Sequence, residues 1–132
     1  MVWKPIRRSG VPEVRDVDEG SDRALLAFPL SDVPPREWAA HLEDQFRGEP
    51  YQYTVQSRYV LVWSQRDQDS FTAWGSNVDR DAKAADEYYR SLLADRERER
   101  EARAEAERQH QEKLNEARGW AQGLEPPSDT PD

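Results

Sequence analysis

The side chains able to carry acid–base or metal chemistry are few in this chain. It has two histidines and no cysteine, so thiol nucleophiles, thiolate metal ligands and disulfides are ruled out. His41 lies beside an apolar helical stripe and is expected to be a solvated surface residue. His110 follows Glu107 at helical spacing, but one imidazole and one carboxylate do not make a metal site. The sequence therefore predicts no catalytic residue, no cofactor and no metal site.

Acidic residues over 16–22 are spaced in a way that suggests calcium ligands. In an EF-hand loop the sixth position is glycine and the twelfth is a bidentate glutamate. Counted from Asp16, these positions are Ser21 and Ala27, so the pattern does not match. We expect an acidic turn between strands instead. The glycines are scattered along the chain and form no phosphate-binding loop.

Aromatic residues on two adjacent predicted strands could stack on the bases of single-stranded RNA. They are Tyr51, Tyr53, Tyr59 and Trp63. Such platforms need a positively charged groove. Residues 1–75 carry 9 basic and 12 acidic side chains, which makes this part of the chain net negative. We therefore predict that these aromatic residues pack in the core.

The charge and the hydropathy of the sequence limit which classes of partner are expected. The net charge is −8, and affinity for nucleic acid or an anionic membrane rests on Lys and Arg, so direct binding to either is not expected. No apolar run approaches the length of about 18 residues that suggests a membrane span. Residues 1–10 lack the apolar run of a signal peptide. We expect a cytoplasmic protein.

The secondary-structure elements of the predicted core lie in the middle of the chain, where aromatic residues are most frequent. Eleven of the thirteen aromatic residues lie between Phe28 and Tyr89, and aromatic side chains bury large areas, so the core is predicted there. Residues 23–30 are apolar on both faces, which predicts a strand covered on both sides that ends near Pro29. Residues 1–22 are predicted to be an N-terminal arm or a weak strand.

Two features predict a helix after this strand. Residues 31–38 combine polar cap residues, prolines and an acid, which is the usual composition of a helix start. Trp38, Leu42 and Phe46 then recur at every fourth position, which places them on one stripe. We expect the helix to pack on the sheet through this stripe.

A hairpin and a second helix complete the predicted core. Alternating and apolar runs on either side of residues 56–58 indicate two paired strands. A helix is expected to begin between Phe71 and Ser76, because apolar residues then recur at helical spacings. These stripe residues are Phe71, Trp74, Val78, Ala82, Ala85, Tyr89 and Leu92. Residues 23–94 are thus predicted to be an α+β core, a small and mainly antiparallel sheet with packed helices in the order β-α-β-β-α.

A long charged helix is predicted to follow the core. Residues 95–118 contain no proline or glycine and are almost entirely Arg, Glu, Ala, Gln and Lys, a composition that favours helix. This segment spans about 36 Å as an α-helix, whereas a core of this size has a radius of gyration of about 12 Å. Because its first turns are polar on every side, residues 95–124 are expected to project into solvent or to meet another chain. Residues 125–132 are expected to be a disordered acidic tail.

Apolar residues return at the far end of this helix. Leu114, Ala117, Trp120 and Leu124 lie at helical spacings, and an isolated tryptophan outside a core is typical of an interface anchor. These four are the predicted protein-interaction residues. The alternatives are that this end frays or folds back against the core. A coiled-coil dimer is a further option, although Gly119 weakens the helix and alanine dominates the seam.

These features favour a non-enzymatic protein–protein interaction module or adaptor, whose long helix reaches a protein partner or a second copy in a homodimer. The alternative is an acidic antagonist, such as an immunity protein or a phage-encoded inhibitor, that occupies the basic site of a nuclease or nucleic-acid-binding protein. Its acids are interleaved with arginine, which weakens the field they can build. An enzyme that uses a carboxylate and a tyrosine is the least favoured hypothesis.

Overall fold

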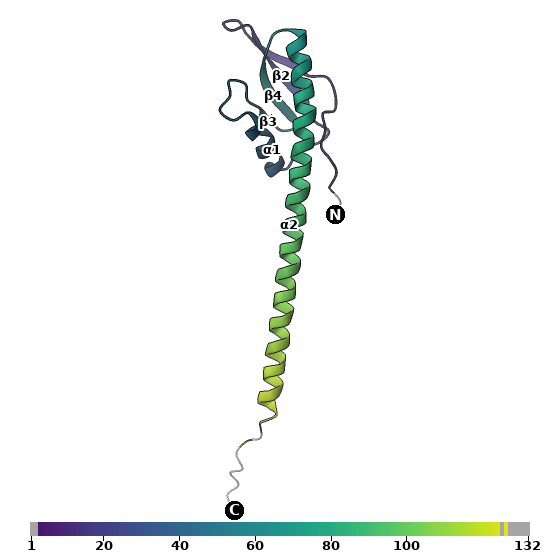
Figure 1. Cartoon of the computed structure of the whole chain (residues 1–132), viewed down its shortest axis with the longest axis vertical. Helices are drawn as coiled ribbons and strands as arrows, with labels where there is room; N and C mark the ends of the chain where they lie inside the picture. The colour runs from purple at the N-terminus through teal and green to yellow at the C-terminus, as the bar shows by residue number, and fades with distance from the viewer. Residues whose placement is uncertain (1–2, 125, 127–132) are drawn as a thin grey trace, which may run out of the picture. The chain divides into compact units, whose positions relative to one another are not determined.

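The computed structural model of this protein describes residues 3–124 and Pro126 (Figure 1). Four strands form one antiparallel sheet in the order β1-β2-β4-β3. The strands are β1 (Glu13–Asp18), β2 (Arg23–Pro29), β3 (Thr54–Gln56) and β4 (Tyr59–Gln65), and the helices are α1 (Arg36–Glu43), the short 3-10 helix η1 (Asp44–Phe46) and α2 (Gln68–Gln122). The predicted α+β fold is confirmed.

The chain divides into two units, and α2 runs through both. The first unit is Met1–Leu92 and the second is Leu93–Asp132. The sheet, α1 and the start of α2 belong to the first unit, and the second unit consists of the rest of α2 and the residues after it. The predicted disordered tail over residues 125–132 lies outside the described residues, apart from Pro126.

The sequence left open whether residues 1–22 form an arm or a weak strand. The structure has a strand there, β1, at one edge of the sheet. Its pairing with β2 is irregular between Val14 and Asp16, and Val14 and Val17 are both exposed. The Oδ1 atom of Asp16 accepts the backbone N–H of Val17 at 2.8 Å. Irregular pairing and charged side chains are common means by which edge strands avoid pairing with other chains.

The acidic segment between β1 and β2 is a turn, as the sequence predicted. The carboxylate of Asp18 accepts hydrogen bonds from the Ser21 hydroxyl and the Gly20 N–H. The bond from Ser21 and then the bond from Gly20 hold the pKa of the Asp18 carboxyl below its ordinary value. Asp18 therefore closes the turn between the two strands.

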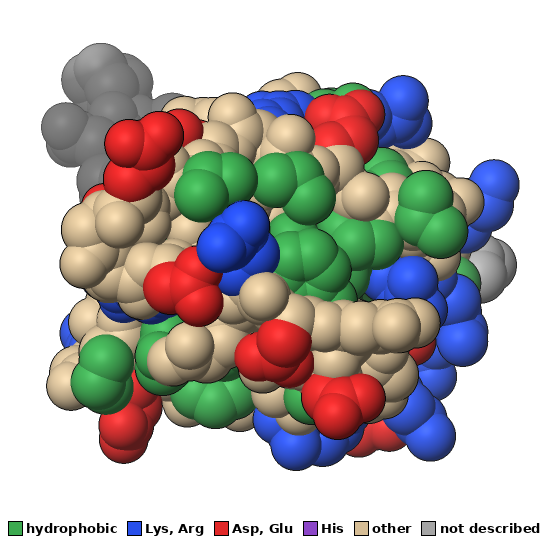
Figure 2. All heavy atoms as spheres, turned by 90° about the horizontal axis from the view of Figure 1, so that it is seen from above, with side chains coloured by type: hydrophobic (Ala, Val, Ile, Leu, Met, Phe, Trp, Pro, Cys, Tyr) green, Lys and Arg blue, Asp and Glu red, His purple; other side chains and the backbone are tan. Residues whose placement is uncertain are grey.

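One face of the sheet, the inner face, packs against both helices. In Figure 1, α2 crosses in front of β2 and β4. The stripe predicted for each helix points into this core: Trp38 and Leu42 of α1 are fully buried, as is Val78 of α2. The core cluster consists of Ile6, Leu26, Phe28, Leu30, Trp38, Leu42, Tyr53, Val60, Val62, Val78, Ala82 and Ala85. Seen from above, hydrophobic side chains also reach the surface in a group bordered by acidic and basic ones (Figure 2).

The opposite face of the sheet carries a second apolar set, which we call the outer sheet face. Its residues, which alternate with the inward-facing ones along β2 and β4, are Leu25, Ala27, Pro29, Tyr59, Leu61 and Trp63. None of them belongs to the core cluster. Both α1 and the start of α2 pack on the inner face, yet no residue of β2 is exposed, and Ala27 on the outer face is fully buried. Tyr59 and Trp63 are half-buried on the outer face and lie outside the core cluster, so the prediction that they pack in the core is wrong.

Helix α2 begins at Gln68, before the start predicted between Phe71 and Ser76. The carboxylate of Asp67 accepts the backbone N–H of Ser70 at 2.7 Å and its hydroxyl at 2.9 Å. A side-chain acceptor at this position satisfies an N–H group of the first turn that has no partner within the helix, and its negative charge interacts favourably with the helix dipole. The prediction relied on apolar periodicity, which starts only at Phe71.

His41 on α1 is half-buried, so its side chain is in partial contact with solvent. Its imidazole stacks on the ring of Tyr88, with ring centroids 4.4 Å apart and planes within 9° of each other. Tyr88 comes from α2, which lies far from α1 in the sequence. The imidazole therefore forms part of the contact between the two helices.

Candidate interaction surfaces

The part of α2 within the second unit exposes almost every side chain. Between Ala94 and Leu124, Leu114 alone is half-buried and the others are exposed. Its ion pairs join neighbours on the same helix, three positions apart: Arg98 with Asp95, Arg100 with Glu97 at 2.8 Å, and Arg108 with Glu105. Such pairs support the helix locally.

We call the four predicted interaction residues the distal stripe: Leu114, Ala117 and Trp120, which lie on one side of the helix, and Leu124, which follows it. The side chain of Trp120 is 70% exposed and that of Leu124 is 77% exposed. Leu124 lies beyond the last helical residue, but its N–H donates to the carbonyl of Ala121 at 3.2 Å, which continues the turn. A tryptophan and a leucine are thus presented together to solvent.

On the outer sheet face, Ala27 is fully buried and Leu61 is 9% exposed. Leu25, Tyr59 and Trp63 are half-buried, and strand alternation places their side chains on the same side of the sheet. The guanidinium of Arg15 lies over the Tyr59 ring, 4.4 Å from its centroid, and pairs with Glu13 at 3.5 Å.

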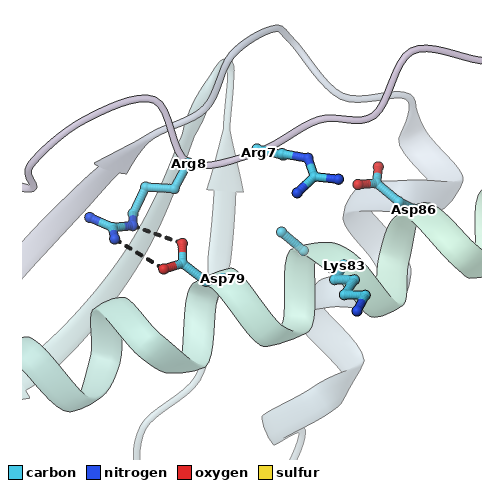
Figure 3. Close-up of a pocket in the computed structure, with 6 residues that line it drawn as sticks. Arg7, Arg8, Asp79, Lys83 and Asp86 are labelled. Atoms are coloured by element: carbon cyan, nitrogen blue, oxygen red, sulfur yellow. Dashed lines mark hydrogen bonds and ion pairs between the residues drawn. The ribbon is translucent and has the colours of Figure 1, made fainter.

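The residues before β1 form a segment that we call the N-terminal arm. A cavity of about 370 Å³ lies between this arm and α2 (Figure 3). It is lined by Arg7, Arg8, Asp79, Ala82, Lys83 and Asp86. Arg8 donates two hydrogen bonds to Asp79, at 2.8 and 3.0 Å. Figure 3 shows Arg7 reaching toward Asp86, whereas Lys83 points away from it. The basic groups do not converge on one point. The cavity is therefore a gap between two packed elements.

Asp86 joins three elements at the floor of this cavity. It is 5% exposed, and its Oδ1 atom accepts the backbone N–H of Ile6 at 3.0 Å and the indole N–H of Trp38 at 2.8 Å. Hydrogen bonds to a charged acceptor are stronger than bonds between neutral groups. Asp86 therefore ties the N-terminal arm and α1 to α2.

A second buried carboxylate, Asp81, accepts the hydroxyl of Tyr53 at 2.8 Å. Burial raises the pKa of the Tyr53 hydroxyl, and the hydrogen bond to Asp81 raises it further. A general acid works best when its pKa lies near the working pH. The shift moves this hydroxyl away from that range, so the pair is suited to holding the loop that carries Tyr53 against α2.

The sequence did not predict the roles of Asp81 and Asp86. Charged residues are rarely buried unless they are paired, and nothing in the composition marks these two among the many acids of the chain. The one local signal is that each is adjacent in sequence to a buried alanine of the α2 stripe, Ala82 or Ala85. Arg80, which pairs with Asp81, is its neighbour in sequence, but the other partners come from distant parts of the chain.

Three further findings concern the class of protein. Among the described residues, no group of three or more His, Cys, Asp or Glu side chains could hold a metal ion. Over the same part of the chain, no helix combines the length and the apolar character needed to cross a bilayer. No family model, no curated protein and no solved structure matches the chain.

Proposed function

We propose that this protein is a non-enzymatic protein–protein interaction module, or adaptor, that binds a partner chain or a second copy through the distal stripe. The observation that carries the proposal is the exposure of Trp120 and Leu124, at 70% and 77%. Tryptophan is among the residues most enriched at binding hot spots, where it fills a pocket on the partner.

The core of the first unit supports the proposal because it needs no residue of the distal segment. The last buried residue of α2 is Asp86, and the residues packed against the core cluster end at Tyr89. In proteins most helical stability comes from packing of an apolar face. Beyond Tyr89 the helix continues to Gln122 without a residue that packs against the core cluster, which is consistent with a role outside its own core.

The experiment compares the full-length chain with the double variant Trp120→Gln/Leu124→Gln. We expect wild-type protein to bind a protein partner, in affinity capture from host cells, or a second copy, in sedimentation equilibrium. The double variant should lose this binding without a change in its free energy of unfolding, because both side chains are exposed. A matched control, Val11→Gln/Val33→Gln, replaces two exposed valines of the first unit and should bind like wild type.

The proposal fails if the double variant keeps the partners and the molecular mass of wild type. It also fails if the control variant loses binding to the same extent, since the effect would then follow from exposed apolar area in general. Denaturation curves of all three proteins exclude unfolding as the cause of any loss.

The acidic-antagonist alternative has less support. Such a protein needs pooled carboxylates that build a strong negative field. Along the second unit, by contrast, acids are paired with arginines on the same helix: Asp95 with Arg98, Glu97 with Arg100, and Glu105 with Arg108. This pairing cancels much of the field that the acids would project.

A further inference from the structure

We propose that an aromatic pocket in the first unit binds a trimethylammonium group, carried either by a small free cation or by a methylated lysine side chain. The pocket is a cavity of about 410 Å³, within the range of about 300 to 1,000 Å³ that is usual for ligand sites. The residues that line this aromatic pocket are Gln45, Phe46, Glu49, Tyr51, Trp74 and Asn77. All of them belong to the first unit, so the pocket shares no residue with the distal stripe.

Three segments of the chain bring the lining residues together. The short helix η1 supplies the first two, the loop that leads to β3 supplies the next two, and α2 supplies the last two. Trp74 and Asn77 are three positions apart, which places their side chains on the same side of α2. The amide of Asn77 makes no hydrogen bond to another described residue, so it is available to a ligand.

A type II β-turn holds Phe46 and Glu49 beside each other. The backbone N–H of Glu49 donates to the carbonyl of Phe46 at 3.0 Å. Between these two residues, Arg47 has a φ of −60° and a ψ of 129°, and Gly48 has a φ of 85°, which are the angles of this turn. Its second central position requires a positive φ, which glycine adopts without strain. The turn therefore brings an aromatic ring and a carboxylate to the same pocket.

Three aromatic rings form the walls of the pocket. The centroid of the Trp74 ring lies 5.3 Å from that of Phe46, with the planes 69° apart, and 6.2 Å from that of Tyr51, with the planes 60° apart. All three side chains are half-buried. Rings tilted in this way meet as walls of a corner instead of stacking. A cation within about 6 Å of a ring centroid is attracted by the negative face of the ring, and tryptophan attracts it most strongly.

Glu49 gives the pocket a negative charge. It is exposed, and its carboxylate makes no hydrogen bond and no ion pair with another described residue. The neighbouring Arg47 is paired with Asp44 at 2.6 Å, so it does not neutralise Glu49. Among the lining residues, Glu49 alone is charged. The pocket therefore attracts a cation and repels an anion.

The ring of Tyr51 is fixed and already has a cation beside it. Its hydroxyl accepts a hydrogen bond from Nε2 of Gln65 at 2.9 Å. The guanidinium of Arg23 lies over the ring, 5.8 Å from its centroid, but Arg23 does not line the pocket. The Tyr51 ring thus takes part in a cation–π contact within the protein while it also forms a wall of the pocket.

A trimethylammonium group fits these walls better than a bare ammonium does. The ammonium of lysine is strongly hydrated and has three donors that need acceptors, and aromatic faces replace its water poorly. A quaternary ammonium has no N–H group, and its recognition by several aromatic rings is a common use of the cation–π interaction. Three rings and one carboxylate are the combination that such a group requires.

The first experiment measures the binding of choline to the full-length chain by calorimetry, with the neutral tert-butyl analogue of choline as a control of the same shape. We expect choline to bind at least about tenfold more tightly than the analogue, because the two differ in charge. A short peptide with trimethyllysine is compared with the same peptide carrying unmodified lysine. If choline binds more tightly than the methylated peptide, the ligand is a small cation. The reverse order assigns the pocket to a methylated protein, and both outcomes support the proposal.

Substitutions test the walls of the pocket. Trp74→Phe keeps a weaker ring face and Trp74→Leu removes it, so the affinity for choline should fall in the order Trp, Phe, Leu, by about tenfold or more for leucine. Trp74 also packs against the core cluster, so Tyr51→Leu provides a second wall variant, at a residue outside that cluster. Denaturation curves show which variants are folded.

A matched pair of variants tests the charge. Glu49→Gln should weaken the binding of choline by about threefold, because an exposed carboxylate contributes little. Glu87→Gln makes the same change at an exposed residue that does not line the pocket and should bind like wild type. The variant Trp120→Gln/Leu124→Gln should also bind choline like wild type, so failure of this proposal and failure of the proposed function are distinguishable.

Four results would overturn the proposal. The first is that neither choline nor the methylated peptide binds at millimolar concentration. The second is that the neutral analogue binds as tightly as choline, and the third is that the unmodified peptide binds as tightly as the methylated one. The fourth is that folded Trp74→Leu or Tyr51→Leu protein binds choline like wild type, because the cation would then lie elsewhere.

Discussion

The indole Nε1 of Trp38 donates a 2.8 Å hydrogen bond to the Oδ1 atom of Asp86, a carboxylate that is 5% exposed. The same oxygen accepts the backbone N–H of Ile6. A buried charge is costly unless hydrogen bonds compensate it, and removal of one partner leaves the others unsatisfied. This one oxygen atom therefore holds together α1, α2 and the N-terminal arm.

The variant Asp86→Ala should lower the free energy of unfolding by about 2 to 5 kcal/mol, because the N–H groups of Trp38 and Ile6 lose their acceptor in the interior. Asp86→Asn keeps an acceptor oxygen and should cost about 1 to 2 kcal/mol. Denaturant unfolding followed by tryptophan fluorescence measures both. Glu87→Ala, at the adjacent exposed position, is the control and should change stability by less than about 0.5 kcal/mol. Equal effects at positions 86 and 87 would contradict the assignment.

The ion pair between Arg8 and Asp79 should contribute far less than Asp86 does. Its side chains are 30% and 51% exposed, so solvent screens their attraction even though the geometry is bidentate. A double-mutant cycle with Arg8→Ala and Asp79→Ala should give a coupling energy of about 0.5 to 1 kcal/mol. This coupling should decrease in high salt. A coupling as large as the Asp86→Ala effect would show that the arm is held mainly by this pair.

Tyr53 should make the protein sensitive to alkaline pH. Its pKa is raised in the folded state by burial and by Asp81, while an unfolded tyrosine ionises near pH 10 at about its ordinary pKa. Below that pH both states are protonated and its contribution is complete. Above it only the unfolded state loses the proton, so the free energy of unfolding falls with rising pH, by at most about 1.4 kcal/mol per pH unit from this residue.

The variant Tyr53→Phe lacks this titration and supplies the comparison. Urea denaturation between pH 8 and about pH 11 should show a shallower decline for Tyr53→Phe than for wild type. Other groups titrate equally in both proteins and cancel in the difference. Parallel curves for the two proteins would mean that Tyr53 ionises in the folded state at its ordinary pKa.

Removal of residues 95–132 should leave a folded first unit. No residue of α2 after Asp86 is buried, so the truncated chain loses no packed side chain and its free energy of unfolding should change by less than about 1 kcal/mol. Calorimetry or denaturant unfolding measures this change. Loss of the cooperative transition in the truncated chain would show that the distal helix helps to hold the core. That result would also remove a main support of the proposed function.

Local patterns in the sequence determine most of the elements without any tertiary contact. The stripes of α1 and α2, the hairpin of β3 and β4, and the long charged helix all follow from spacings within a few residues of each other. Such spacings depend on backbone geometry alone, which is why they can be recognised in a sequence. The early start of α2 at Gln68 was missed because it depends on a side-chain cap at Asp67, outside the apolar period.

Tertiary structure alone decided which apolar face the helices pack against and which acids are buried. Alternation along β2 shows that both of its faces are apolar, but the helices of the first unit cover only the inner one. The three groups that meet at Asp86 belong to Ile6, Trp38 and Asp86 itself, separated by as many as 80 positions. A hydrogen bond between distant residues leaves no periodic trace in the sequence, because only the path of the folded chain brings its donor and acceptor together.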